Sequence, residues 1–124
     1  MRARPARKDD RIVIYQKPTC TTCRKVYAAL SEGGADFYAV NYYTDPIPKT
    51  KIVQLLKKMG MTPRELLRAG EPIYKELGLA SRQMSDAQLI DLMVKHPDLI
   101  QRPIVERGDR AILARPATRI AEIL

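Results

Sequence analysis

The architecture of this chain follows from one stretch, Ile12-Val-Ile-Tyr-Gln-Lys-Pro-Thr-Cys20-Thr-Thr-Cys23-Arg-Lys-Val-Tyr27. A β-branched run is followed by a turn at Pro18, a Cys-x-x-Cys pair and a helical pattern, an order typical of a redox site in an α/β fold. A thiol at a helix start meets free backbone N–H groups and the positive end of the helix dipole, which favour the thiolate. The sequence therefore predicts nucleophilic attack by Cys20, on a disulfide or on an oxyanion.

The segments around the cysteines predict a βαβ unit. We expect a buried strand over residues 11–15, a helix from Cys20 or Thr21 to Leu30, and a second strand over residues 36–43. A helix between two strands of one sheet makes those strands parallel.

A helical middle follows. A helix is expected from Pro48 to the residue before Gly60. Capping boxes over residues 62–65 and 85–88 predict two further helix starts, and the second of these helices should end before Pro97.

The end of the chain returns to strand character. Residues 103–105 and 111–114 predict a β-hairpin with Gly108 in its turn, and Pro116 opens a last helix. The whole order predicts an α/β fold with a thioredoxin-like, glutaredoxin-type sheet and an inserted helical segment.

Length and composition predict a single domain. The 124 residues suffice for one buried core, so we expect residues 11–124 to form one domain and residues 1–10 a disordered basic tail. No apolar run approaches the roughly 18 residues that span a bilayer, and the charged N-terminus lacks the apolar core of a secretory signal. We expect a cytoplasmic protein without a membrane partner, a monomer by default.

The formal net charge of +8 would attract small anions or nucleic acid. The basic residues are spread along the chain, and only one Phe and six Tyr are available to stack on bases. Nucleic acid is therefore not the expected main partner.

The two cysteines admit three interpretations. Cys20 would be a nucleophile with Cys23 one turn deeper, within reach for a disulfide. Alternatively, both are small buried hydrophobes. A zinc site is the third, but a closed structural site needs four ligands and Cys20, Cys23 and His96 are the only Cys or His side chains. His96 precedes a proline at a helix end, where it would meet the negative helix terminus.

Two arginines have side chains that extend from a constrained backbone. Arg102 and Arg115 each directly precede a proline, which holds the backbone extended. Arg102-Pro103 also occupies the place where a thioredoxin-like fold carries a cis-proline facing its active cysteine. Spacing alone does not show that Arg102, Arg115 or Arg68 converges on Cys20.

Ordered blocks over residues 11–124 resemble the glutaredoxin-coupled arsenate reductases (the ArsC type) and their relatives, which include the Spx-type redox regulators. The matching blocks are Tyr15-Gln-Lys-Pro-Thr-Cys20, Met59-Gly60, Arg64-Glu-Leu-Leu-Arg68, Tyr74-Lys-Glu-Leu-Gly78-Leu79, Ser85-Asp86-Ala-Gln88-Leu89-Ile90-Asp91, His96-Pro97, Leu99-Ile100-Gln101-Arg102-Pro103-Ile104-Val105 and Arg115-Pro116.

The resemblance implies roles for four residues. In the family's reductases the cysteine matching Cys20 attacks arsenate, and the arginines matching Arg68, Arg102 and Arg115 bind the oxyanion and keep the cysteine ionised. Arginine forks match tetrahedral oxyanions, and fixed positive charge lowers a thiol pKa.

Two positions depart from the reductase pattern. The reductases usually carry Ser where this chain has Cys23, and often His where it has Gln16. A cysteine at position 23 resembles the Cys-x-x-Cys of the Spx branch. It allows a cycle in which Cys23, and not glutathione, attacks the Cys20 adduct.

The resemblance implies an oxidoreductase that reduces arsenate or a related oxyanion to arsenite. Glutathione would serve as co-substrate with no bound cofactor, and glutaredoxin or thioredoxin would restore the thiol. The alternative is a Spx-like redox-sensing regulator that binds RNA polymerase and uses a Cys20–Cys23 disulfide as its switch. A glutathione-dependent reductase of another substrate is also open.

Overall fold

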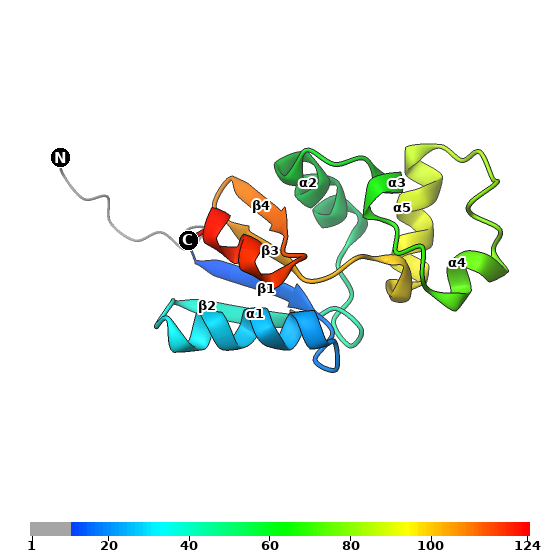
Figure 1. The fold of residues 1–124 in the computed structure, drawn as a ribbon. Helices are drawn as coiled ribbons and strands as arrows, with labels where there is room; N and C mark the ends of the chain where they lie inside the picture. Colours follow the sequence, from blue (N-terminus) through cyan, green and yellow to red (C-terminus); the bar gives the residue numbers. More distant parts are fainter. Residues whose placement is uncertain (1–10) are drawn as a thin grey trace. The chain divides into compact units, whose positions relative to one another are not determined.

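The computed structural model describes residues 11–124, and the expectation of a basic tail over residues 1–10 lies outside the described residues. The chain divides into two compact units. The sheet unit contains the described residues of Met1–Val40 together with Arg102–Leu124, and the helical unit contains Asn41–Gln101. In Figure 1 the sheet unit carries the blue-to-cyan and the orange-to-red segments.

The elements of the sheet unit are β1 (Ile12–Gln16), α1 (Thr21–Glu32), β2 (Phe37–Asn41), β3 (Ile104–Arg107), β4 (Arg110–Leu113) and the 3₁₀ helix η3 (Ala117–Glu122). Within the described residues four strands form one sheet in the order β2-β1-β3-β4. β3 runs antiparallel to both β1 and β4. β1 and β2 are neighbours joined through α1, which is the predicted βαβ connection.

One face of this sheet is covered by α1 and η3. Alternate residues of β1, Ile12 and Ile14, point to this face and pack with Val26 and Leu30 of α1 and with Ile120 of η3. This packing sets α1 against the sheet, so the position of its N-terminus is fixed by the core.

The predicted hairpin is confirmed. β3 and β4 pair from Ile104↔Leu113 to Arg107↔Arg110, and Gly108 in the turn has a φ of 60°. Glycine adopts this left-handed conformation without the strain that a Cβ would cause.

The last helix differs from its prediction. Pro116 precedes it as expected, but the segment is a 3₁₀ helix of six residues. The backbone N–H of Arg119 donates to the Pro116 carbonyl at 3.0 Å, and that of Ile123 to the Ile120 carbonyl at 3.1 Å. Short segments that cannot propagate an α-helix commonly use these tighter i→i+3 bonds.

The elements of the helical unit are α2 (Lys49–Met59), α3 (Pro63–Leu66), α4 (Pro72–Glu76), α5 (Asp86–Lys95) and the 3₁₀ helix η2 (Pro97–Leu99). α2 ends at Gly60, as predicted, in a left-handed C-cap with φ 65°. α5 packs against α2, α3 and η2. No helix in the described part of the chain is long and apolar enough to cross a membrane.

Both predicted capping boxes are present. At the start of α3 the Glu65 N–H donates to the Thr62 hydroxyl at 3.2 Å, and the Thr62 N–H donates to the Glu65 carboxylate at 2.9 Å. Ser85 and Gln88 make the same reciprocal pair at α5. Each box satisfies two donors that the helix start would otherwise leave unpaired.

Helix α4 was not predicted. It has five residues and none of its side chains is buried, so it leaves no apolar periodicity in the sequence. The isolated bridge between Leu67 and Ile100 was also missed, because it joins segments far apart in the sequence.

Candidate active site

Cys20 is the N-cap residue of α1. Its backbone is extended, with φ −75° and ψ 128°, and its Sγ accepts a hydrogen bond from the Cys23 N–H at 3.4 Å. The Cys20 N–H donates to the Lys17 carbonyl at 2.9 Å, which closes the turn after β1. The sulfur therefore takes the place of the side-chain oxygen that usually satisfies a free donor at a helix start.

The environment of Cys20 favours its thiolate. Partial burial raises the pKa, but hydrogen bonds from the Cys23 N–H, the Cys23 thiol and the Arg102 guanidinium, together with the charge of Arg102, outweigh it. These interactions lower the pKa of Cys20 from 9.0 to about 7. Near neutral pH a large fraction of this sulfur is ionised, as a nucleophile requires.

Cys23 lies inside the first turn of α1 and has an exposed fraction of 0%. Burial is the largest effect on it, and with the hydrogen bond and negative charge of Cys20 it raises the pKa of Cys23 to about 12. A backbone hydrogen bond from Lys17 and the charge of Arg102 act in the opposite direction. The two thiols thus differ in ionisation although they are one helical turn apart.

Arg102 belongs to the sheet unit, like Cys20, although the two residues lie far apart in the sequence. It directly precedes β3, its peptide bond to Pro103 is cis, and its exposed fraction is 5%. The hydrogen bonding and the positive charge of its guanidinium both lower the pKa of Cys20. The structure therefore brings Cys20, Cys23 and Arg102 together.

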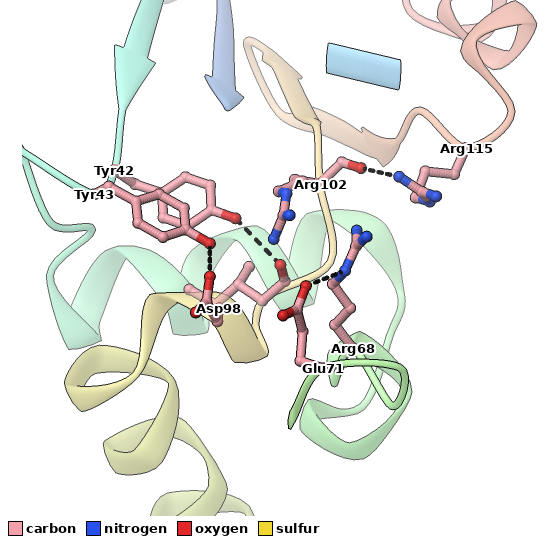
Figure 2. A network of polar contacts seen from close by, with 8 residues as sticks. Tyr42, Tyr43, Arg68, Glu71, Asp98, Arg102 and Arg115 are labelled. Carbon is pink, nitrogen blue, oxygen red and sulfur yellow. Dashed lines mark hydrogen bonds and ion pairs between the residues drawn. The ribbon is translucent and has the colours of Figure 1, made fainter. Parts of the chain in front are cut away.

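Arg115 contacts the main chain of Arg102. One of its terminal nitrogens, Nη1, donates to the Arg102 main-chain carbonyl at 2.9 Å (Figure 2). Arg115 is half-buried, and its peptide bond to Pro116 is also cis. The bond joins the two arginine-proline turns that bracket the hairpin.

Arg68 lies in the helical unit. Its Nε forms an ion pair with Glu71 at 2.8 Å, as Figure 2 shows, and its backbone N–H donates to the Leu99 carbonyl at 2.7 Å. These bonds fix both the backbone and the side chain of Arg68 within its own unit. Its role at the oxyanion stays a prediction.

Two buried polar features of the sheet unit were not predicted. The Tyr15 hydroxyl donates to Glu106 at 2.8 Å between the neighbouring strands β1 and β3. Gln16, at the end of β1, has an exposed fraction of 7%, and its Oε1 has no hydrogen-bond partner among residues 11–124. The departure from the reductase pattern at Gln16 was the only signal in the sequence.

His96 takes the predicted place at a helix end. It is the C-cap of α5, and its N–H donates to the Leu92 carbonyl at 2.7 Å. Within residues 11–124 no group of three or more His, Cys, Asp or Glu side chains is placed to hold a metal ion.

Comparison with known proteins adds to this geometry. The sequence model of the ArsC family matches residues 15–123. This chain belongs to the ArsC family. The match includes the whole Cys-x-x-Cys segment, the helical unit and the hairpin.

Three proteins illustrate what this ArsC family chain is similar to. It is 38% identical over 113 residues to an arsenate reductase of Escherichia coli (strain K12), an alignment that covers 91% of this chain and 80% of that protein. It is 38% identical over 114 residues to the uncharacterized protein YfgD of the same strain, covering 91% and 96%. The solved structure of an arsenate reductase from Vibrio cholerae matches with a TM-score of 0.86 at 34% identity, covering 91% of this chain and 97% of that one.

The structural likeness confirms the predicted fold of this ArsC family chain, a thioredoxin-like α/β arrangement with an inserted helical segment.

Proposed function

We propose that this chain is a thiol-dependent oxidoreductase that reduces arsenate, or a related tetrahedral oxyanion, to arsenite. The observation that carries the proposal is the Cys20 sulfur at the start of α1, which accepts a hydrogen bond from the Cys23 N–H and whose pKa the buried Arg102 lowers. Family membership and the arsenate reductases among its relatives support the choice of substrate.

In the first step the Cys20 thiolate attacks arsenic. A sulfur–arsenic bond forms, one arsenic–oxygen bond breaks, and that oxygen leaves as water after taking up protons. The charge of Arg102 acts on the Cys20 sulfur, and a guanidinium can donate two parallel hydrogen bonds to an oxyanion held there. We assign this role to Arg102.

Two further arginines are proposed as oxyanion ligands from the family motifs alone. Arg68 ends the Arg-x-Leu-Leu-Arg block and Arg115 precedes the last proline, as in the family's reductases. In the described structure Arg68 pairs with Glu71, and Arg115 bonds to Arg102. Binding of the oxyanion would require at least part of each guanidinium to face the anion.

In the second step another thiol attacks the Cys20 sulfur. A disulfide forms, the sulfur–arsenic bond breaks with its electron pair left on arsenic, and arsenite departs. The attacking thiol is glutathione or Cys23, and glutaredoxin or thioredoxin then restores the Cys20 thiol. No bound cofactor takes part, and a reducing compartment such as the cytoplasm suits this chemistry because free thiols persist there.

The test is arsenate-dependent oxidation of NADPH, coupled through glutathione, glutaredoxin and glutathione reductase, with thioredoxin coupling run in parallel. The native chain should turn over, Cys20→Ser should be inactive, and Arg102→Lys should be strongly impaired because the fork geometry is lost. Arg82→Lys is the matched control, since Arg82 is exposed and its Nη1 donates to the Leu77 carbonyl. A native chain silent with both reductant systems would overturn the proposal.

No observation in the structure or among these relatives favours the redox-regulator alternative, so a single function is proposed.

A further inference from the structure

We propose that Cys23 is the resolving nucleophile of this site and that the free Cys20 thiolate keeps it inactive until Cys20 has captured the oxyanion. This inference rests on the proposed function and selects one of the two thiols that the second step allows.

The first support is position. The Cys23 backbone nitrogen donates to the Cys20 Sγ at 3.4 Å, and hydrogen bonding by the Cys23 thiol is among the interactions that lower the pKa of Cys20. Cys23 is fully buried, so it cannot meet a dissolved substrate, but attack on its neighbour needs no path through solvent. A nucleophile already in contact with its target gains the large rate advantage of an intramolecular reaction.

The second support is electrostatic. Burial raises the pKa of Cys23 most, and the hydrogen bond to Cys20 and the negative charge of Cys20 raise it further. When the Cys20 sulfur becomes bonded to arsenic it loses its negative charge, so both contributions of Cys20 disappear. The charge of Arg102 and the Lys17 backbone bond, which lower the pKa of Cys23, remain. Capture of the oxyanion thus makes Cys23 easier to ionise.

The step balances without an added reductant. The Cys23 sulfur attacks the Cys20 sulfur, a sulfur–sulfur bond forms, and the sulfur–arsenic bond breaks. Its electron pair stays on arsenic, which passes from As(V) to As(III), while the two sulfurs are oxidised by the same two electrons. The Cys23 proton passes to a departing arsenite oxygen or to water. Over both steps, arsenate and two thiols give arsenite, one disulfide and water.

This cycle changes the reductant that the chain needs. Arsenite leaves before any outside thiol has acted, and the oxidised product is a disulfide within the chain. A protein dithiol of the thioredoxin or glutaredoxin kind can reduce such a disulfide by successive attack of its two thiols. Glutathione then becomes dispensable for arsenite release.

The experiment is a single turnover without any small thiol, under anaerobic conditions, with the fully reduced chain and excess arsenate. We expect the native chain to release one equivalent of arsenite and to lose both free thiols, which are the only two cysteines of the sequence. Cys23→Ser should release no arsenite until glutathione is added and then turn over. Thr22→Ser, a substitution next to Cys23, is the control that should behave as the native chain.

The inference is wrong if the native chain releases arsenite only when glutathione is present, or if Cys23→Ser releases as much as the native chain without it. If arsenate is not the substrate, a second reaction still tests Cys23. Oxidised glutathione should convert the native chain to the internal disulfide with release of both glutathione halves, whereas Cys23→Ser should stop at a stable mixed disulfide on Cys20. A native chain that also stops at the mixed disulfide would overturn the inference whatever the substrate.

The proposed control of Cys23 ionisation by the Cys20 thiolate can be measured directly. A Cys23 with a purely structural role would show no such effect. We expect the midpoint for ionisation of Cys23, followed by NMR of a labelled cysteine, to be lower in Cys20→Ala than in the native chain. An unchanged midpoint would contradict the control of Cys23 by Cys20.

Discussion

Arg115 donates a hydrogen bond from Nη1 to the main-chain carbonyl of Arg102 at 2.9 Å (Figure 2). Arg102 in turn is the cation whose hydrogen bonding and charge lower the pKa of Cys20. Since the carbonyl belongs to the residue that carries this cation, Arg115 holds the backbone from which the Arg102 side chain extends. Arg115 is therefore a positioning residue for Cys20, in addition to its proposed contact with the oxyanion.

Replacement of Arg115 tests this relationship. Arg115→Met should raise the pKa of Cys20 from about 7 towards 9.0, because Arg102 loses the bond that holds its backbone. The arsenate kcat/KM should fall about 10- to 100-fold, as expected for the loss of one hydrogen bond from a charged group. Thiolate absorbance against pH and steady-state kinetics measure the two effects.

Arg110→Met is the control for this change, because Arg110 is exposed and, within residues 11–124, donates to the carbonyls of Glu122 and Ile123 at 3.5 Å. If Arg115→Met lowers kcat/KM without moving the thiolate midpoint, Arg115 acts on the oxyanion alone.

The reactivity of Cys20 should depend on pH with a midpoint of about 7, the pKa that its surroundings give it. The thiolate is the reactive form, so the rate of alkylation by iodoacetamide should rise as pH increases through 7 and level off above it. Because the folded pKa lies below the ordinary 9.0, the same ionisation adds stability above pH 9 that is lost as pH falls through 7.

Arg102→Met should move this midpoint upward, since both its hydrogen bond and its charge favour the thiolate. A midpoint that stays at its native value in Arg102→Met would show that the helix start alone ionises Cys20.

The bond between Tyr15 and Glu106 should contribute to the stability of the sheet unit. Tyr15→Phe removes the hydroxyl that donates to the buried Glu106 at 2.8 Å, and the free energy of unfolding should fall by about 1–3 kcal/mol. Urea unfolding measures the loss. Tyr38→Phe is the control: its ring is 45% exposed and packs under Arg11, so a change within about 0.5 kcal/mol is expected. Equal effects of the two substitutions would contradict the role of the buried bond.

The capping boxes of the helical unit should each contribute measurably. Thr62→Ala and Ser85→Ala remove the hydroxyls that accept the N–H groups of Glu65 and Gln88, and each should lower the free energy of unfolding by about 1 kcal/mol. Ser31→Ala, on the exposed side of α1, should have little effect. If neither substitution lowers the free energy of unfolding more than Ser31→Ala does, solvent replaces the capping hydrogen bonds without loss of stability.

Local features of the fold could be predicted from the sequence. The strand before Cys20, the position of Cys20 at a helix start, the two capping boxes and the glycine turn of the hairpin each depend on residues within about one helical turn of one another. Their signals therefore stand in contiguous sequence, and the structure confirms them. Helix α4 shows the converse, because a five-residue helix without buried side chains leaves no pattern to find.

Which cation acts on the sulfur depends instead on contacts between distant segments. The contact of Arg102 with Cys20, the bond from Arg115 to Arg102 and the bond from Tyr15 to Glu106 all join segments separated by most of the chain or by the hairpin. They form because β3 pairs with β1 on one side and with β4 on the other, and the packing of a whole sheet face sets this pairing. The chain's helix start supplies a thiol that can ionise, and the fold supplies the charge that stabilises it.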